Sequence, residues 1–245
     1  MSKVEEAVRS RYASTARQLA VVPPVDCCSG DASCECDCGG PYSAEELGEV
    51  GMTGAMSLGC GNPTLLARLE PGQVVLDLGS GAGLDVLLSA RRVAPDGHAY
   101  GVDMTDEMLE LAERNRQKAG VQNATFLRGK IDAVPLPDAS VDVVISNCVI
   151  NLTEDKGAVI REAFRVLKPG GLFAVADMVE LKPMPARMKK RLDSWAGCIS
   201  GSIPVQEYRS LLTETGFAEP DIDVHSVHGR EAHVGSAYIR AHKKT

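Results

Sequence analysis

Short apolar runs alternate with longer amphipathic stretches through the middle of the chain. The runs have the length of strands, and the stretches repeat apolar positions with the period of a helix. The pattern predicts strands at 73–78, 98–103, 124–128, 141–146 and 171–177, and helices at 83–93, 106–119 and 155–167. Strands and helices that alternate in this way form a parallel sheet with helices on both faces, so we expect an α/β fold.

The residues before this region predict two helices separated by an irregular segment. Residues 2–21 carry apolar side chains at helical spacing and predict an amphipathic helix that packs over the main domain. Residues 23–42 are rich in Gly, Asp, Ser and Cys, which is typical of an irregular loop. A further helix is expected at 42–50, because Ser43 and Glu46 have the spacing of a capping box.

The residues after Met178 predict a smaller region that serves as a substrate cap. They contain a Pro-flanked segment, a helix with Trp195 and Cys198, a second helix at 204–215 and a strand near 234–242. We therefore expect three parts: an N-terminal helical and Cys-rich segment at 1–60, a cofactor-binding α/β domain at 61–178, and a substrate-binding cap with a C-terminal strand at 179–245.

Composition narrows the class of partner. The net charge is −7 and the pI is near 5.3, whereas nucleic-acid and membrane surfaces need clustered Lys and Arg. No apolar run approaches the roughly 18 residues that span a bilayer, and no signal-peptide pattern is present. We expect a cytoplasmic monomer that acts on a small molecule and binds neither nucleic acid nor a membrane.

A glycine-rich turn follows the first predicted strand. In Asp77-Leu78-Gly79-Ser80-Gly81-Ala82-Gly83 the glycines permit a tight turn and close approach of the backbone to a ligand. Asp103 ends the next strand, 20 residues after Gly83, where a carboxylate accepts hydrogen bonds from ribose hydroxyls. A dinucleotide-binding domain has a similar layout, but its last glycine would stand where this chain has Leu84.

This acidic and glycine-rich run resembles the class I S-adenosylmethionine-dependent methyltransferases. The resemblance implies their Rossmann-like sheet and S-adenosylmethionine as cofactor. Asp77 would then face the cationic ammonium of the methionine part, which a carboxylate attracts, and Ile131 would pack on the adenine ring. The cofactor-binding residues that the resemblance implies are Asp77, Gly79, Ser80, Gly81, Gly83, Asp103, Met104, Lys130, Ile131 and Asn147.

Eight cysteines stand in two groups that need separate explanations. A disulfide framework is not expected, because cytosolic thiols are kept reduced and a domain of this size is stable without disulfide cross-links. The dense group is Cys27, Cys28, Cys34, Cys36 and Cys38, and the single cysteines are Cys60, Cys148 and Cys198. Cys148 follows an apolar strand, at the edge where open α/β sheets place their ligands.

The three single cysteines lie in contexts that resemble the arsenite S-adenosylmethionine methyltransferases. The contexts are Gly59-Cys60-Gly61-Asn62-Pro63, Ser146-Asn147-Cys148-Val149-Ile150-Asn151-Leu152 and Trp195-Ala196-Gly197-Cys198. The resemblance implies that Cys60, Cys148 and Cys198 bind trivalent arsenic as thiolates and that the protein serves arsenic detoxification. Soft arsenic prefers thiolates and keeps a lone pair as the nucleophile, so catalysis is mainly positioning and needs no general base.

The same resemblance implies redox chemistry among the cysteines. Methylation formally oxidises arsenic, and a disulfide between neighbouring cysteines would return the electrons before thioredoxin or glutathione resets it. A further family cysteine lies upstream of Gly-Cys-Gly, with Cys28 and Cys34 as candidates for the relay. The cluster is alternatively a second arsenical-loading site or a plain thiol-rich loop. A zinc site is not favoured, because the C-x-C-x-C spacing lacks the usual C-x₂₋₄-C pairs and a nearby His.

One position departs from the family pattern, and two other functions stay open. Leu58 stands where some members carry an aromatic residue, so no gating role is assigned there. The first alternative is a carbon or oxygen methyltransferase of a small molecule, with incidental cysteines. The second is a non-catalytic relative that binds arsenicals or metals.

Overall fold

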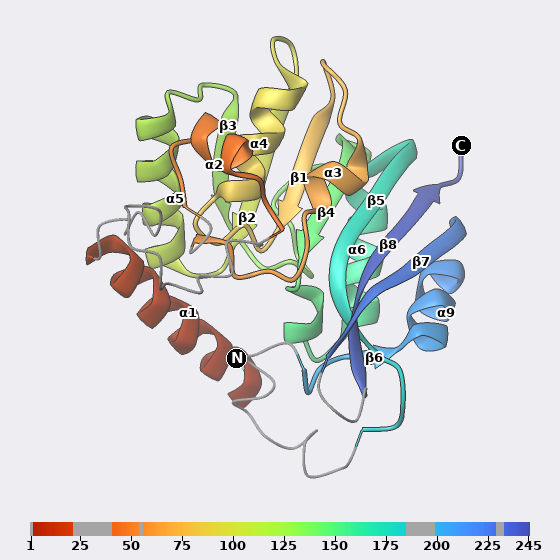
Figure 1. Ribbon diagram of the computed structural model, residues 1–245. Helices are drawn as coiled ribbons and strands as arrows, with labels where there is room; N and C mark the ends of the chain where they lie inside the picture. Colours follow the sequence, from red (N-terminus) through yellow and green to blue (C-terminus); the bar gives the residue numbers. More distant parts are fainter. Residues whose placement is uncertain (1, 22–40, 54–55, 185–198, 229–232) are drawn as a thin grey trace.

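One eight-stranded sheet forms the centre of the molecule, in a computed structural model that describes residues 2–21, 41–53, 56–184, 199–228 and 233–245. The strand order is β3-β2-β1-β4-β5-β8-β7, and β6 pairs with β5 (Figure 1). The strands β1 to β5 are parallel to one another, whereas β8 runs antiparallel to both β5 and β7. The strands are β1 Val74–Leu78, β2 His98–Asp103, β3 Ala124–Arg128, β4 Val141–Asn147, β5 Leu167–Glu180, β6 Ile203–Pro204, β7 Phe217–His228 and β8 Val234–Lys243.

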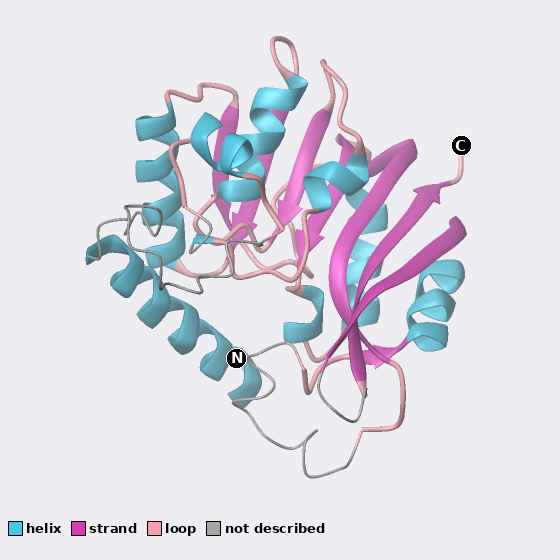
Figure 2. Ribbon diagram, in the orientation of Figure 1, coloured by secondary structure: helices cyan, strands magenta, loops and turns pink. Residues whose placement is uncertain are grey.

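Helices pack on both faces of this sheet (Figure 2). The helices are α1 Lys3–Val21, α2 Ala44–Glu49, α3 Pro63–Ala67, α4 Leu84–Val93, α5 Asp106–Ala119, α6 Lys156–Val166 and α9 Val205–Thr215, with a 3₁₀ turn η2 at Ile150–Leu152. No helix in the described part of the chain is long and apolar enough to cross a membrane. The α/β class predicted from the alternation of elements is confirmed.

Two apolar cores account for the strongly hydrophobic strands. Val75 and Val143 face a core that α4 and α5 complete, while Leu76 and Val144 face a second core completed by α6 and α9. Successive side chains of a strand point to opposite faces, so a strand buried on both faces must be apolar throughout. The continuous apolar runs seen in the sequence follow from this double burial.

The predicted elements are confirmed where the pattern is strongly periodic. The capping box of α2 is present, since Glu46 N donates to Ser43 Oγ and Ser43 N donates to the Glu46 carboxylate. β5 is longer than predicted, because it begins at Leu167 and continues through residues 168–171, where its register with β4 is broken. The expected helix with Trp195 and Cys198 and the irregular loop at 23–42 fall on residues outside those described, Pro41 and Tyr42 excepted.

Strand β7 was not predicted from the sequence. It lies at the edge of the sheet, where only one flank pairs with β8. Its side chains alternate between half-buried and exposed, and Pro220 interrupts the segment. Edge strands tolerate proline and polar residues because one row of their backbone groups faces solvent. The alternation of Ile222 and Val224 with acidic and polar residues was the signal available.

Helix α1 lies across the edge where β1 and β2 end (Figure 1). Val4, Val8 and Tyr12 on its apolar side pack in one cluster with Cys148 and Leu152. Ion pairs join its polar side to the sheet domain, with Arg17 paired to Glu107 at 2.6 Å. The expectation that this helix packs over the main domain is confirmed.

A buried carboxyl group lies at the end of β5. Asp177 is fully buried, and its Oδ1 accepts hydrogen bonds from Asn151 Nδ2 at 2.7 Å and Met178 N at 2.9 Å. Its Oδ2 has no hydrogen-bond partner among the described residues. Burial raises the pKa of Asp177 from 3.8 to about 7, against the opposing effect of these hydrogen bonds and of Lys156. The protonated form is therefore favoured in the folded protein below about pH 7.

The raised pKa predicts how stability depends on pH. A folded-state pKa above the unfolded value stabilises the protein below pH 4, and this contribution is lost as the pH rises toward 7. In Asp177→Asn the residue cannot ionise. Urea unfolding at several pH values should show wild-type stability falling relative to the variant across this window, by at most about 1.4 kcal/mol per pH unit. Parallel pH profiles would contradict the assignment.

Truncation of the core predicts a large loss of stability. Leu88 on α4 is fully buried in the core formed with β1 and β4. Leu88→Ala should lower the free energy of unfolding by about 2–5 kcal/mol, because it removes buried methyl groups and leaves a cavity. Leu65→Ala on α3 is the matched control, since Leu65 is 58% exposed. Equal losses for the two variants in urea denaturation would contradict the packing described.

Candidate functional site

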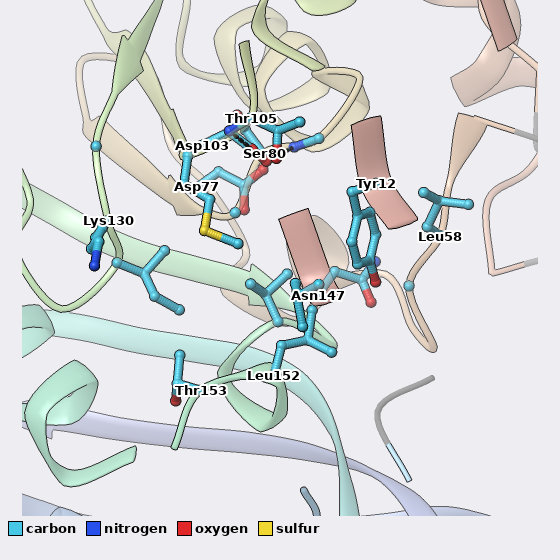
Figure 3. Close-up of a pocket in the computed structure, with 18 of the residues that line it drawn as sticks. Tyr12, Leu58, Asp77, Ser80, Asp103, Thr105, Lys130, Asn147, Leu152 and Thr153 are labelled. Carbon is cyan, nitrogen blue, oxygen red and sulfur yellow. Dashed lines mark hydrogen bonds between the residues drawn. The ribbon is translucent and has the colours of Figure 1, made fainter. Parts of the chain in front are cut away.

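A cavity of about 350 Å³ lies at the edge where β1, β2 and β4 end (Figure 3). The structure brings together nearly all the residues predicted to bind the cofactor. Those that line the cavity are Asp77, Gly79, Ser80, Gly81, Asp103, Met104, Lys130, Ile131 and Asn147. Residues far apart in the sequence meet here because parallel strands end at the same edge of the sheet.

Gly83 belongs to the turn but does not line the cavity. It precedes α4 with φ +88, a conformation that favours glycine. A Cβ at this position would lie 2.7 Å from the Phe126 ring and 3.1 Å from Ala112. Gly83 therefore lets α4 start close to β3 and α5, which is a packing role.

Asp103 holds the glycine turn in place. Its Oδ2 accepts a hydrogen bond from Gly81 N at 3.0 Å, and its Oδ1 accepts one from Thr105 N at 2.8 Å. Burial raises the pKa of Asp103, and these backbone donors oppose the shift because they favour the charged form. One carboxylate thus fixes the turn and faces the cavity.

Two further aspartates make the cavity strongly acidic. Asp77 is buried, and burial followed by the charges of Asp85 and Asp103 raises its pKa well above 3.8. Burial likewise raises the pKa of Asp85 to about 6, against hydrogen bonds from Tyr42 and Asn147. Asp77 Oδ1 has no hydrogen-bond partner among the described residues. An unpartnered buried carboxylate oxygen beside other acids fits a cationic ligand.

Helix α1 forms one wall of the cavity. Glu5, Val8 and Tyr12 line it, and Glu5 Oε1 lies 2.7 Å from Lys130 Nζ. The Lys130 side chain is therefore directed to α1. Figure 3 shows Tyr12 beside Leu58, on the side of the cavity away from Lys130. The sequence predicted the helix but not that its residues complete this wall.

Two of the three single cysteines lie next to each other beside the cavity. Cys60 and Cys148 are joined by a disulfide, with Cα atoms 5.9 Å apart across 88 residues of sequence. The prediction of thiolates at these positions therefore differs from the structure, which holds the oxidised form of the pair. Cys148 has φ +59, a conformation that costs energy for a residue other than glycine and is typical of functional sites.

The remaining cysteines lie outside the described residues. They are Cys27, Cys28, Cys34, Cys36, Cys38 and Cys198. Across the described ranges, no group of three or more His, Cys, Asp or Glu side chains is placed to hold a metal ion. The meeting of Cys198 with the disulfide pair and the relay role of the cluster stay predictions.

Asn147 connects the disulfide to the cavity, together with two residues that the sequence did not indicate. Its side chain contacts the Cys60–Gly61 backbone, the Tyr42 hydroxyl at 2.9 Å and the Asp85 carboxylate at 3.4 Å. Asp85 stands in the first turn of the helix after the glycines, which was the signal available for it. Tyr42 carried no signal, because its partners come from distant parts of the chain.

Comparison with known proteins identifies the family. The model of a methyltransferase domain matches residues 69–216. An arsenite methyltransferase of Halobacterium salinarum is 41% identical over 90% of this chain and 59% of its own length. The human arsenite methyltransferase is 37% identical over 60% of this chain and 41% of its own length. The chain thus spans about three fifths or less of these two relatives.

A solved structure agrees with the sequence comparison. The crystal structure of CrArsM, an arsenic (III) S-adenosylmethionine methyltransferase from Chlamydomonas reinhardtii, superposes with a TM-score of 0.67. It is 30% identical and covers 94% of this chain and 73% of its own. The likeness extends beyond the methyltransferase domain, because it includes nearly the whole chain. The chain belongs to the arsenite S-adenosylmethionine methyltransferases.

Proposed function

We propose that this protein transfers methyl groups from S-adenosylmethionine to trivalent arsenic bound by its cysteine thiolates. The observation that carries the proposal is the meeting of Cys60 and Cys148 beside the acidic cavity. Their neighbours Gly59, Asn147 and Val149 line that cavity. Identity to arsenite methyltransferases over most of the chain supports the same reaction.

The cavity residues fit S-adenosylmethionine, which when bound supplies an electrophilic methyl group. The unpartnered Asp77 carboxylate oxygen suits the ammonium of the methionine part, since the attraction offsets the cost of burying its charge. Asp103 is placed for the ribose hydroxyls, and Met104 and Ile131 supply apolar surface for the adenine. Helix α1 shields this cavity from water on one side.

The cysteine pair supplies two functions to the substrate. In the reduced state two adjacent thiolates chelate soft arsenic and leave its lone pair free to act as the nucleophile. Cys198 would be the third ligand. Fixing arsenic beside the cavity raises its effective concentration at the methyl group, so the protein acts mainly by positioning. Oxidation of the two thiolates to the disulfide releases the two electrons that return methylated arsenic to the trivalent state.

The cycle requires a reductant and a reducing compartment. Two thiols of glutathione, or the dithiol of thioredoxin, would restore the cysteine pair by thiol–disulfide exchange. Cys28 and Cys34 would relay electrons between the reductant and this pair. We further propose a cytoplasmic monomer in which residues 179–245 contribute the substrate cap and residues 61–178 bind the cofactor.

Substitution of Asp103 should weaken cofactor binding. In Asp103→Asn an amide donor replaces one acceptor oxygen, so a ribose hydroxyl or a backbone N–H loses its charged partner. The dissociation constant for S-adenosylmethionine, measured by titration calorimetry, should rise roughly ten-fold or more. Asp106→Asn is the control, because Asp106 is exposed on α5 and pairs with Arg128. Equal affinities for the two variants would overturn the assignment of Asp103.

Substitution of Cys148 should abolish arsenic methylation and spare cofactor binding. Purified Cys148→Ser, incubated with arsenite, S-adenosylmethionine and glutathione, should yield at least about a hundred-fold less methylated arsenic by mass spectrometry. The variant loses one thiolate ligand and the partner of Cys60. Its affinity for S-adenosylmethionine serves as the folding control and should equal that of the wild type. Undiminished methylation by the variant would refute the proposed role.

The same assay, carried out with the wild-type protein, distinguishes the proposed function from the two alternatives. Methylation of a phenol or quinone precursor, with arsenite left unmodified, would indicate a small-molecule carbon or oxygen methyltransferase. Binding of arsenite without turnover would indicate a non-catalytic relative. Both results contradict the proposed function.

A further inference from the structure

The amide of Asn147 is saturated by the loop that carries Cys60 together with Tyr42. Its Oδ1 accepts hydrogen bonds from Cys60 N at 2.9 Å and Gly61 N at 3.2 Å. Its Nδ2 donates to Gly61 O at 2.7 Å and to the Tyr42 hydroxyl at 2.9 Å. One side chain thus holds three backbone groups of two consecutive residues.

The hydrogen-bond partners define the orientation of this amide. Tyr42 is buried, and burial with the nearby Asp85 charge raises its pKa, so its hydroxyl keeps its proton. That proton is donated to Asp85 Oδ1 at 2.7 Å, which leaves the hydroxyl oxygen as acceptor for Asn147 Nδ2. An amide nitrogen cannot accept a hydrogen bond. If the amide were flipped, its NH₂ group would face the backbone N–H groups of Cys60 and Gly61 and leave them without an acceptor. Asp85 and Tyr42 therefore orient Asn147.

The loop also fits the amide sterically. A Cβ on Gly59 would lie 2.0 Å from the Asn147 side-chain carbon, so only glycine allows the loop to lie against the amide. A Cβ on Gly61 would lie 2.6 Å from Ala176 Cβ. The carbonyl of Ala176 in turn accepts the hydrogen bond from Cys148 N at 2.8 Å. The loop of Cys60 and the backbone of Cys148 therefore both contact Ala176 of β5.

We propose that Asn147, oriented by Tyr42 and Asp85, is a positioning residue that holds the Cys60 sulfur within bonding distance of the Cys148 sulfur. Its side chain fixes the backbone of one cysteine, and its main chain is joined to the other. This role differs from the cofactor contact predicted for Asn147, and it rests on the disulfide and on the hydrogen bonds. The proposal deepens the proposed function, because the same pair would bind arsenic when reduced.

The thiol–disulfide equilibrium of the pair measures this positioning directly. Reduction breaks the Cys60–Cys148 bond, adds two electrons and two protons, and oxidises two glutathione thiols to one glutathione disulfide. A fixed Cys60 loop raises the effective concentration of one sulfur at the other and favours the disulfide. Release of the loop favours the dithiol, because the two sulfurs then meet less often.

The experiment equilibrates the 245-residue chain in glutathione buffers of graded composition, without arsenic. Acid quenching, alkylation and peptide mass spectrometry then quantify the Cys60–Cys148 linkage separately from the other cysteines. Asn147→Ala should lower the ratio of disulfide to dithiol about ten-fold, which corresponds to the loss of one or two net hydrogen bonds. Tyr42→Phe should shift the ratio in the same direction by a smaller factor, since it removes only the group that orients the amide.

Asn123→Ala is the matched control. Asn123 Nδ2 also donates to two backbone carbonyls, Ala90 O at 2.7 Å and Gly97 O at 3.0 Å, but it lies just before β3, at the opposite end of that strand from the cavity. This control should leave the ratio unchanged.

An unchanged ratio in Asn147→Ala, or an equal shift in Asn123→Ala, would overturn the proposal. If Asn147→Ala does not fold, an unchanged ratio in Tyr42→Phe overturns it instead. Failure of the proposed function would appear separately, as absence of arsenic methylation by a wild-type protein whose disulfide equilibrium is normal.

Discussion

The parallel pairing of β1 with β4 is the interaction on which the site depends. Leu78 stands opposite Ser146 at the last step of this ladder, and the Ser146 hydroxyl donates to the Leu78 carbonyl at 2.9 Å. The chain therefore leaves both strands at the same level, which places the glycine turn beside Asn147 and Cys148. A slip of one residue would exchange the buried faces of a strand, so the apolar side chains on both faces hold this register.

The buried acids at this edge of the sheet lower the stability of the fold, but they give the cavity a site for a cationic ligand. Asp77 and Asp85 are buried close together, and the pKa of each is raised by burial. Carboxylates in such surroundings are stabilised by a bound cation or by donated hydrogen bonds. Asp85 has hydrogen bonds from Tyr42 and Asn147, whereas Asp77 Oδ1 has none among the described residues. The acidic cluster therefore divides into a structural member and a member that suits a cationic cofactor.

Elements with strong periodicity were predictable, and contacts between distant segments were not. The strands β1 to β4 and the helices α4 to α6 have ends close to those expected, because double burial leaves a plain apolar signature. β7 escaped prediction because an edge strand has only one buried flank. The contacts of Tyr42, and the place of α1 in the wall of the cavity, were not predictable, since the partner residues stand tens of residues away in the sequence.

The sequence by itself determined the α/β class, the glycine turn with Asp103, and the three cysteine contexts, because each is a local pattern of residue types and spacings. Only the tertiary structure decided that Cys60 and Cys148 are joined by a disulfide, that Gly83 packs against Phe126, and that the Asn147 amide holds the Cys60 loop. These facts depend on the strand order of the sheet, which places β2 and β3 on one side of β1, and β4 and β5 on the other. Spacing along a chain does not encode that proximity, because packing between elements produces it.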